Sequence, residues 1–316
     1  MNPGPLQLGS SSTGKAAFGV ASADMGGEIL LRRVFIDLRQ LTLEQSASPG
    51  RPGLNNIAHR PILRAVPRQN WDDLPDDVRA AVSKHTGLVK GAKSAVSGFS
   101  SQIAVTLDTV NGRVFVKGMR QDHARAWTQQ CEAVVNPHVV PIGPRLLWRV
   151  TADGWDLLGF EHLTGRSADF SPASTDIFLV VEAMAALGRI PCPDVELKDA
   201  GQRWGAYPAD AALLTGTALL HTDWNHTNAL ITGTDAVWLV DWAAATRGAA
   251  WIDPACWVVW LIFAGHAPSE AEQWAAKAPA WSTAPASSPR PLRRRPGSRL
   301  AAHRRQTSPC MDPPSP

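Results

Sequence analysis

The hydrophobic pattern of the chain changes from strand-like to helical along its length. Apolar and polar residues alternate in the runs 94–108 and 112–119, which an Asn-Gly turn connects, and this combination is typical of a β-hairpin. A second hairpin is predicted within 144–163, where an Asp-Gly turn separates two apolar runs. The two hairpins together predict a small β-sheet.

Two helices are predicted beside this sheet. Leu74, Val78 and Val82 recur at helical spacing, and Gly87 is placed to end their helix. The other helix, 122–136, should end before the proline that follows, because proline has no N–H to continue the hydrogen-bond ladder. The first half of the chain therefore predicts a small sheet with an inserted helix.

From Thr164 onward the apolar residues follow helical spacing, most clearly over 174–190 and 251–281. The longest apolar run, 255–265, is shorter than the roughly 20 residues that a membrane-spanning helix needs. We therefore predict a buried helix there and no membrane partner. The expected fold class is α+β, with a small β-rich N-terminal lobe and a larger helical C-terminal lobe joined near 160–165.

The two ends of the chain differ in composition from its centre. Residues 1–70 mix Gly, Ser and Pro with a single apolar-periodic island, and residues 282–316 hold eight prolines without a hydrophobic period. Such segments bury too little apolar surface to offset the entropy lost on ordering. We therefore expect a poorly ordered extension and a disordered tail, flanking a small lobe at 71–163 and a helical lobe at 164–281.

Charge and cysteine usage narrow the class of protein. The chain has a net charge of +3, yet residues 282–316 contain seven arginines and one aspartate. Residues 71–281 carry 16 basic and 23 acidic side chains, so the ordered part is acidic and specific nucleic-acid binding is not expected. Four scattered cysteines and the absence of a signal peptide predict free thiols and a cytoplasmic location.

A compact set of polar residues lies within “LLHTDWNHTNALITGTDAVWLVDW”, residues 219–242. His221, Asp223 and Asn228 share one loop, and a predicted hairpin brings Asp241 close to them. Two crowded carboxylates repel each other unless a cation or a proton is shared between them. Oxygen ligands of this kind suit Mg²⁺, which takes one or two protein carboxylates together with substrate phosphates. The set therefore predicts phosphoryl transfer, in which one aspartate orients and deprotonates a hydroxyl.

Two other interpretations of these residues stay open. In the first, His221 and Asp223 cap a turn and Asp241 merely ends a strand. In the second, His221, Asp223 and His226 are metal ligands of a hydrolase, at H-x-D-x-x-H spacing. Tight retention of zinc would favour the hydrolase, whereas weak, nucleotide-dependent magnesium binding would favour the phosphotransferase.

The segment “HTDWNHTN”, followed by “LVDW”, resembles the catalytic loop and metal-binding segment of the aminoglycoside phosphotransferase family, relatives of the protein kinases. The likeness extends from residue 71 to about residue 281. It implies a two-lobed protein-kinase-like fold and transfer of the γ-phosphoryl group of ATP to a hydroxyl of a small molecule, for example an aminoglycoside. It also implies that Asp223 is the catalytic base, that Asn228 and Asp241 bind Mg²⁺, and that His221 supports the loop.

The same resemblance assigns roles in the small lobe and the hinge. In “VFVKG”, Lys117 would contact the nucleotide phosphates, and Glu132 in “QQCEAVV” would pair with it. The segment “GFEHLTG” would be the hinge, with the backbone of Glu161 and Leu163 near the adenine. In “WIDPACW”, Asp253 would brace the catalytic loop.

Some positions depart from the family pattern. The loop “SAVSGFSSQ” has one glycine where protein kinases carry several, and we assign Ser97, Gly98 and Ser100 to the phosphate contact there. Thr222 replaces a glycine that is often found before the catalytic aspartate. After Trp281 the sequence lacks the further helices with which the family completes its acceptor pocket. We therefore expect an impaired acceptor site, and a non-catalytic nucleotide-binding relative stays open as an alternative.

Overall fold

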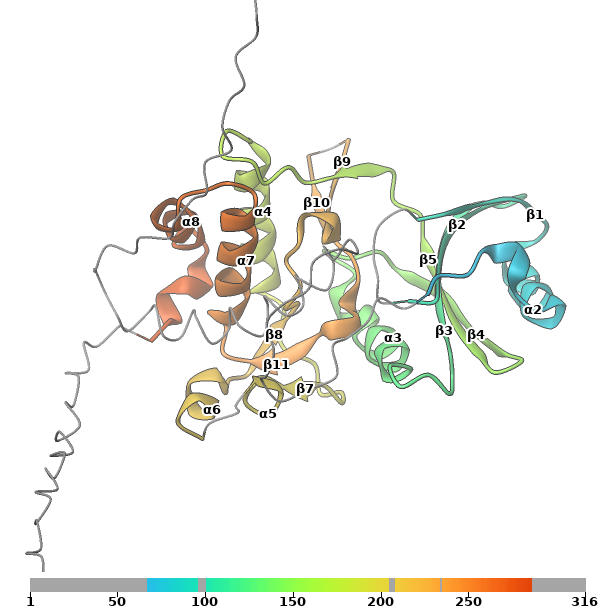
Figure 1. The fold of residues 1–316 in the computed structure, drawn as a ribbon, viewed down its shortest axis with the longest axis horizontal. Coiled ribbons are helices and arrows are strands. Elements are labelled where there is room, and N and C mark those ends of the chain that lie inside the picture. The colour runs from blue at the N-terminus through green and yellow to red at the C-terminus, as the bar shows by residue number, and fades with distance from the viewer. Residues whose placement is uncertain (1–66, 96–100, 205–207, 234, 286–316) are drawn as a thin grey trace, which may run out of the picture. The chain divides into compact units, whose positions relative to one another are not determined.

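The computed structural model describes residues 67–285, apart from 96–100, 205–207 and 234. These residues form a two-lobed α+β fold (Figure 1), in which a β-rich part is followed by a helical part. The expected fold class is thus confirmed. The described part begins slightly ahead of residue 71, and its last 3-10 turn, Pro279–Thr283, runs past Trp281.

The first lobe is built on a five-stranded antiparallel sheet with the order β1-β2-β3-β5-β4. The strands are β1 (Val89–Ser94), β2 (Ile103–Thr109), β3 (Gly112–Arg120), β4 (Leu146–Ala152) and β5 (Trp155–Glu161). The predicted hairpins are confirmed as β2–β3 and β4–β5. The second turns at Asp153 and Gly154, which both have positive φ as a type I′ turn requires. The sequence pattern did not indicate β1, because this edge strand is mostly polar and largely exposed.

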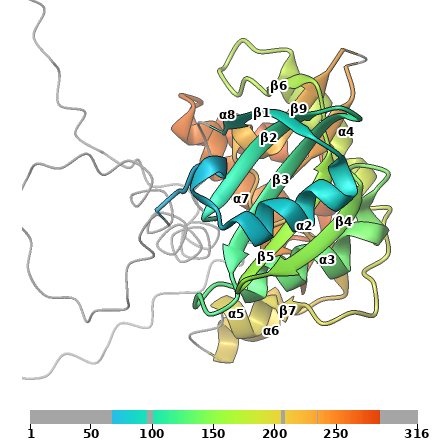
Figure 2. The ribbon, with the colours of Figure 1, turned by 90° about the vertical axis from the view of Figure 1, so that its right-hand side faces the viewer.

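Helix α2 (Asp76–Thr86) lies across one face of this sheet (Figure 2). Its apolar side chains Val78 and Val82 are fully buried against the strands, as their helical spacing predicted. Gly87 ends the helix with a φ of 72°, a conformation in which glycine avoids the strain of a side chain. One hydrophobic core therefore joins α2 to the sheet.

Helix α3 (Trp127–Val139) continues through Pro137, so the prediction that it ends at residue 136 is wrong. Pro137 stands in the last turn, where only a short stretch of the ladder is affected, and Val139 beyond it is fully buried. Next to the proline, the Asn136 side chain donates to the Pro144 carbonyl at 2.7 Å and fixes the chain that follows. Burial and this anchor keep the helix intact past the proline.

The second lobe contains most of the helices and two small sheets. Its helices are α4 (Asp176–Leu187), α5 (Ala200–Trp204), α6 (Pro208–Leu214), α7 (Ile252–Phe263) and α8 (Pro268–Ala275). One sheet has the order β10-β9-β6, formed by β10 (Val237–Leu239), β9 (Ala229–Thr232) and β6 (Gly165–Ser167). The other has the order β7-β11-β8, formed by β7 (Lys198–Asp199), β11 (Thr246–Gly248) and β8 (Ala218–Leu220).

A second hydrophobic core fills this lobe and also includes α3. Cys131, Val135 and Val139 on α3 pack with residues of α4, α7 and the small sheets. Figure 1 shows α3 between the five-stranded sheet and the helical lobe. Although α3 follows a strand of the first lobe, its apolar face is therefore anchored in the core of the second.

The buried helix expected from the longest apolar run is present as α7, most of whose side chains are buried. No helix in the described part of the chain is long and apolar enough to cross a membrane. Three of the four cysteines fall in the described ranges and carry free thiols. Cys310 lies outside the described residues.

We predict that Gly159→Ala destabilises the first lobe. A Cβ at this position on β5 would come within 2.2 Å of the Trp148 ring on the paired strand β4. That ring is stacked on His85 of α2 and cannot move without repacking, so we expect a loss of about 1–3 kcal/mol of unfolding free energy. Urea denaturation measures it. Gly91→Ala on the edge strand is the control, since its Cβ would meet no atom within 4 Å, and equal midpoints for the two variants would contradict the prediction.

Candidate active site

The β9–β10 hairpin brings the two halves of the predicted site together. The loop that follows β8 runs from His221 to Asn228 and ends in a 3-10 turn directly before β9. After the turn of the hairpin, the Val240 N–H donates to the Asn228 carbonyl at 2.9 Å. Asp241 is the next residue, so it lies beside Asn228 although many residues separate the two in the chain.

Asp253, in the first turn of α7, holds the start of the loop. Its two carboxylate oxygens accept the backbone N–H groups of His221 at 2.9 Å and Thr222 at 2.8 Å. Burial raises the pKa of Asp253, and the two backbone hydrogen bonds counteract part of that effect. A buried carboxylate that accepts two backbone donors fixes the position of the loop relative to α7.

Thr222 has a φ of 68°, a left-handed conformation that is uncommon for a β-branched residue. The Thr222 hydroxyl donates to the Ala244 carbonyl at 3.0 Å and accepts from Arg203 Nη1 at 2.9 Å. These contacts, together with Asp253, hold a conformation that would otherwise be strained.

Arg203 is a supporting residue that the sequence pattern did not reveal. It lies near the end of the short helix α5, and its Nη1 group also contacts the Ala244 carbonyl at 3.0 Å and the Thr246 hydroxyl at 2.8 Å. Burial lowers the pKa of Arg203, despite nearby acidic groups that include Asp223. No local motif surrounds this arginine, so only the folded chain shows that it reaches the loop.

His221 is buried, and both of its ring nitrogens have partners. Nε2 lies 2.9 Å from the Val240 carbonyl, and Nδ1 accepts the Asp223 N–H at 3.3 Å. This arrangement requires the tautomer protonated at Nε2. The ring therefore connects the loop to the strand before Asp241, which is a supporting position.

The ligand set of the hydrolase alternative does not assemble. His226 is exposed, and neither ring nitrogen of His221 is available for a metal. Within the described residues, no group of three His, Cys, Asp or Glu side chains is placed to hold a metal ion. The geometry therefore disfavours a zinc hydrolase built on these residues.

Asn225 orients the Asp223 carboxylate. Its Nδ2 group donates to Asp223 Oδ1 at 2.8 Å, and its Oδ1 accepts the Thr227 N–H at 2.9 Å. Burial raises the pKa of Asp223, although the hydrogen bond from Asn225 counteracts it. The sequence reasoning missed Asn225, and its spacing two residues after Asp223 is the signal that was available.

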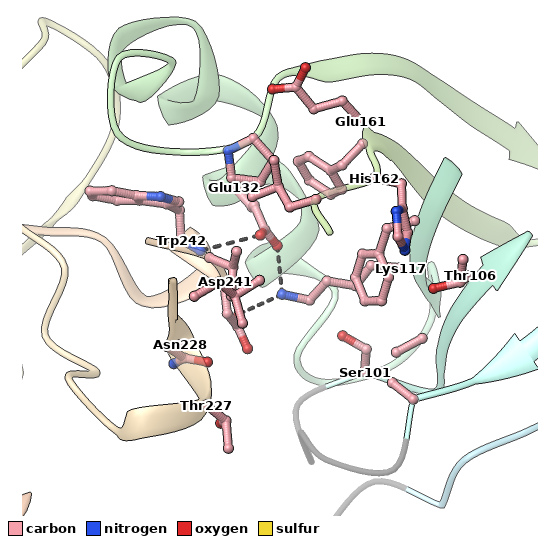
Figure 3. Close-up of a pocket in the computed structure, with 18 of the residues that line it drawn as sticks. Ser101, Thr106, Lys117, Glu132, Glu161, His162, Thr227, Asn228, Asp241 and Trp242 are labelled. Carbon is pink, nitrogen blue, oxygen red and sulfur yellow. Dashed lines mark hydrogen bonds and ion pairs between the residues drawn. The ribbon is translucent and has the colours of Figure 1, made fainter. Parts of the chain in front are cut away.

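Asn228 and Asp241 face the same cavity. Asn228 Nδ2 donates to the Asp223 carbonyl at 3.1 Å, which turns its Oδ1 towards the cavity (Figure 3). Asp241 lies two residues after the end of β10 and has a φ of 65°, and its carboxylate contacts Lys117 (Figure 3). Two oxygen-bearing side chains thereby line the same cavity.

Lys117 connects the two lobes through a buried cluster of charges. From β3, its Nζ contacts Glu132 Oε2 on α3 at 2.7 Å and Asp241 Oδ1 at 2.5 Å (Figure 3). Glu132 Oε1 also accepts the Trp242 N–H at 3.2 Å. Burial alone would lower the pKa of Lys117, but the two carboxylates outweigh it and raise the pKa above its ordinary value. Lys117 is thus held as a cation.

A cavity of about 250 Å³ surrounds this cluster. Of the predicted site residues, six line it: Lys117, Glu132, Glu161, Leu163, Asn228 and Asp241. Asp223 and His221 lie in the adjacent loop and are not part of the wall. Ser97, Gly98 and Ser100 lie outside the described residues.

The predicted hinge forms one side of the cavity. The Glu161 N–H donates to the Arg145 carbonyl at 3.0 Å, and Glu161 Oε1 accepts the Arg145 N–H at 2.9 Å. These bonds tie the end of β5 to the chain before β4, and Leu163 follows at the cavity wall. The backbone between the lobes is therefore fixed next to the cavity.

The described chain thus has a β-rich lobe before a larger helical lobe, with the cavity between them. No family model matches the chain, and no curated protein matches it by sequence.

Comparison with solved structures finds several small-molecule kinases. Choline kinase LicA from Streptococcus pneumoniae, in complex with AMP, is 12% identical with a TM-score of 0.49, covering 66% of this chain and 80% of LicA. Spectinomycin phosphotransferase APH(9)-Ia, in complex with ADP and spectinomycin, is 10% identical with a TM-score of 0.43, covering 64% and 78%. An aminoglycoside phosphotransferase from Alicyclobacillus acidocaldarius is 14% identical with a TM-score of 0.42, covering 66% and 84%. Likenesses this distant carry no functional argument, which comes from the residues of this chain.

We predict that Asp253→Asn loosens the loop and destabilises the protein. An asparagine presents only one oxygen, so one of the two buried N–H groups, of His221 or Thr222, loses its acceptor. An unsatisfied buried donor costs about 1–3 kcal/mol, which urea or thermal unfolding would detect. Asp194→Asn makes the same change at an exposed position of the same lobe and should leave stability unaltered. If Asp253→Asn is as stable as Asp194→Asn, Asp253 does not brace the loop.

Proposed function

We propose that this protein is an ATP-dependent phosphotransferase that moves the γ-phosphoryl group to a hydroxyl of a small molecule. The observation that carries the proposal is the buried cation of Lys117 between Glu132 and Asp241, in a cavity that Asn228 also faces. Taking these charges out of water is costly, and a purely structural role would be served as well by apolar residues.

The cavity offers the two surfaces that a nucleotide requires. Part of its wall is apolar and includes Ala104, Phe160, Leu230 and Val240, which suits the faces of an adenine ring. The hinge lies at the edge of this wall, where backbone groups can recognise the edge of the base. Lys117 lies at the charged side, where its ammonium would contact the phosphates of a bound nucleotide.

The donor set fits a magnesium ion. Asn228 and Asp241 supply two oxygen donors, and Mg²⁺ usually takes one or two protein carboxylates with phosphates and waters completing its shell. When bound, the ion would neutralise charge that develops on the phosphates. Asp241 would exchange part of its contact with Lys117 for the ion, which frees the ammonium for the nucleotide.

Asp223 is the group proposed to receive the acceptor proton. Its carboxylate is held by Asn225, and its raised pKa brings it closer to that of a general base active near neutral pH. In the reaction, the acceptor oxygen forms a bond to the γ-phosphorus while the bond to the bridging β–γ oxygen breaks. The hydroxyl proton passes to Asp223, and ADP leaves with the electron pair of the broken bond.

The acceptor class follows from charge. Residues 71–281 are acidic overall, which favours cationic small molecules, including aminoglycosides, over nucleic acids. An acceptor must also carry a hydroxyl that can approach Asp223. We therefore propose a small hydroxylated acceptor, and among such molecules those with amino groups.

The direct test incubates the protein with Mg-ATP and a panel of small hydroxylated amines and alcohols. Mass spectrometry should find one acceptor heavier by a phosphoryl group, together with a matching amount of ADP. Binding of Mg-ATP without any transfer across a broad panel would favour the non-catalytic nucleotide-binding alternative. Failure to bind Mg-ATP would refute the proposal altogether.

We predict that Asp223→Asn lowers phosphoryl transfer at least about a hundredfold with little change in Mg-ATP affinity. The amide cannot accept the hydroxyl proton, whereas the contacts of Lys117 and Asp241 with the nucleotide persist. Steady-state kinetics and a binding titration on the same preparation separate the two effects. Asp235→Asn is the matched control, because it makes the same change on the exposed β9–β10 turn. Near-normal turnover of Asp223→Asn would show that another group takes the proton.

A further inference from the structure

A short segment ahead of α2 lies against the cavity. The Gln69 N–H donates to the Gln102 carbonyl at 2.7 Å, which holds this segment beside the start of β2. The neighbouring Arg68 is half-buried and lines the cavity. The sequence reasoning had placed it in a poorly ordered extension. A segment outside the expected small lobe therefore contributes an arginine to the site.

The position of the Arg68 side chain is fixed by the sheet. Its Nη1 group donates to the Ala95 carbonyl at 2.6 Å, and the Ala95 N–H donates in turn to the Ala104 carbonyl at 2.9 Å. Burial lowers the pKa of Arg68, and the negative charge of Asp241 on the opposite lobe counteracts part of this effect. One edge of the guanidinium is thus anchored at the end of the β1–β2 pairing while its charge acts across the cavity.

Ser101 supplies a second, independent observation. Its side chain is only 2% exposed and lines the cavity, yet its hydroxyl has no hydrogen-bond partner in the described part of the protein. Figure 3 shows Ser101 on the side of the cavity opposite Asn228 and Asp241. Buried hydroxyls almost always find a partner, so this one is suited to a ligand that brings an acceptor or a donor.

The balance of charge indicates what kind of ligand this is. Around the cavity, the Lys117 ammonium is outnumbered by the carboxylates of Glu132 and Asp241. Arg68 adds a second cation to the cavity wall and offsets one of these carboxylates, while the Glu161 carboxylate, which also lines the cavity, lies 3.8 Å from Arg145. Without Arg68 the cavity would present a larger excess of negative charge to Mg-ATP, which is itself an anion.

We propose that Arg68 and Ser101 form the small-lobe half of the phosphate site, where they bind the β- and γ-phosphates of a nucleoside triphosphate. Guanidinium groups suit phosphate oxygens because their N–H donors are planar and paired, and a serine hydroxyl adds one further donor. The inference rests on the proposed function and adds a residue to it from outside the expected lobe.

Calorimetric titration of the full chain with Mg-ATP, and separately with adenosine, tests this assignment. Arg68→Gln should weaken Mg-ATP binding about tenfold, as expected for the loss of a charge-assisted hydrogen bond, and should change adenosine binding less than about twofold. Arg68→Lys should retain part of the affinity, and Ser101→Ala should weaken Mg-ATP binding by a smaller factor than Arg68→Gln. Lys84→Gln removes the same charge at an exposed position of α2 and should bind like the wild type.

The outcomes separate this inference from the proposed function. If the wild type binds Mg-ATP and Arg68→Gln binds it equally well, the phosphate role of Arg68 is wrong while the proposed function stands. If Arg68→Gln weakens adenosine and Mg-ATP binding equally, Arg68 only shapes the cavity and the phosphate role is wrong. Binding by Arg68→Lys would show that the protein still folds when this residue is changed. A wild type that binds no Mg-ATP would overturn both proposals.

Discussion

The ion cluster at Lys117 is the interaction on which the arrangement of the two lobes depends. Its three charged groups come from a strand of the first lobe, a helix anchored in the core of the second, and the turn after β10. Each group is costly to bury alone, and removing Lys117 would leave two carboxylates, Glu132 and Asp241, without their shared counter-charge. Because Glu132 also binds the backbone of Trp242, the cluster fixes both the lobes and the segment that carries Asp241.

The loop from His221 to Asn228 is organised differently, by hydrogen bonds to backbone groups. Asp253 accepts two backbone donors, and Arg203 together with the Thr222 hydroxyl ties the loop to the segment before β11. These contacts maintain the left-handed conformation of Thr222, which a glycine would adopt without strain. The fold thus orients Asp223 through buried polar contacts, whereas it positions Lys117 and Asp241 through charge.

Much of this could be predicted from local patterns. The hairpins carry Asn-Gly and Asp-Gly turns, and α7 is a continuous apolar run. The β9–β10 hairpin, also predicted, returns the chain so that Asp241 follows a residue bonded to Asn228. What the pattern could not predict depends on long-range contact. Strand β1 is polar because it forms an exposed edge, and the helix at Pro137 continues because tertiary burial stabilises its last turn. Arg68 and Arg203 act through long side chains whose targets are distant in the sequence.

The Lys117 cluster and Asn228 are proposed to form a magnesium–nucleotide site. Calorimetric titration of the wild-type protein with ATP, in the presence of Mg²⁺ and again with EDTA, tests this proposal. Since Asp241 and Asn228 contribute only two oxygens, the ion should bind chiefly together with the nucleotide. We expect Mg²⁺ to tighten ATP binding by at least about tenfold and Lys117→Met to weaken it. Equal ATP affinity with and without Mg²⁺, unaffected by Lys117→Met, would show that these residues do not form such a site.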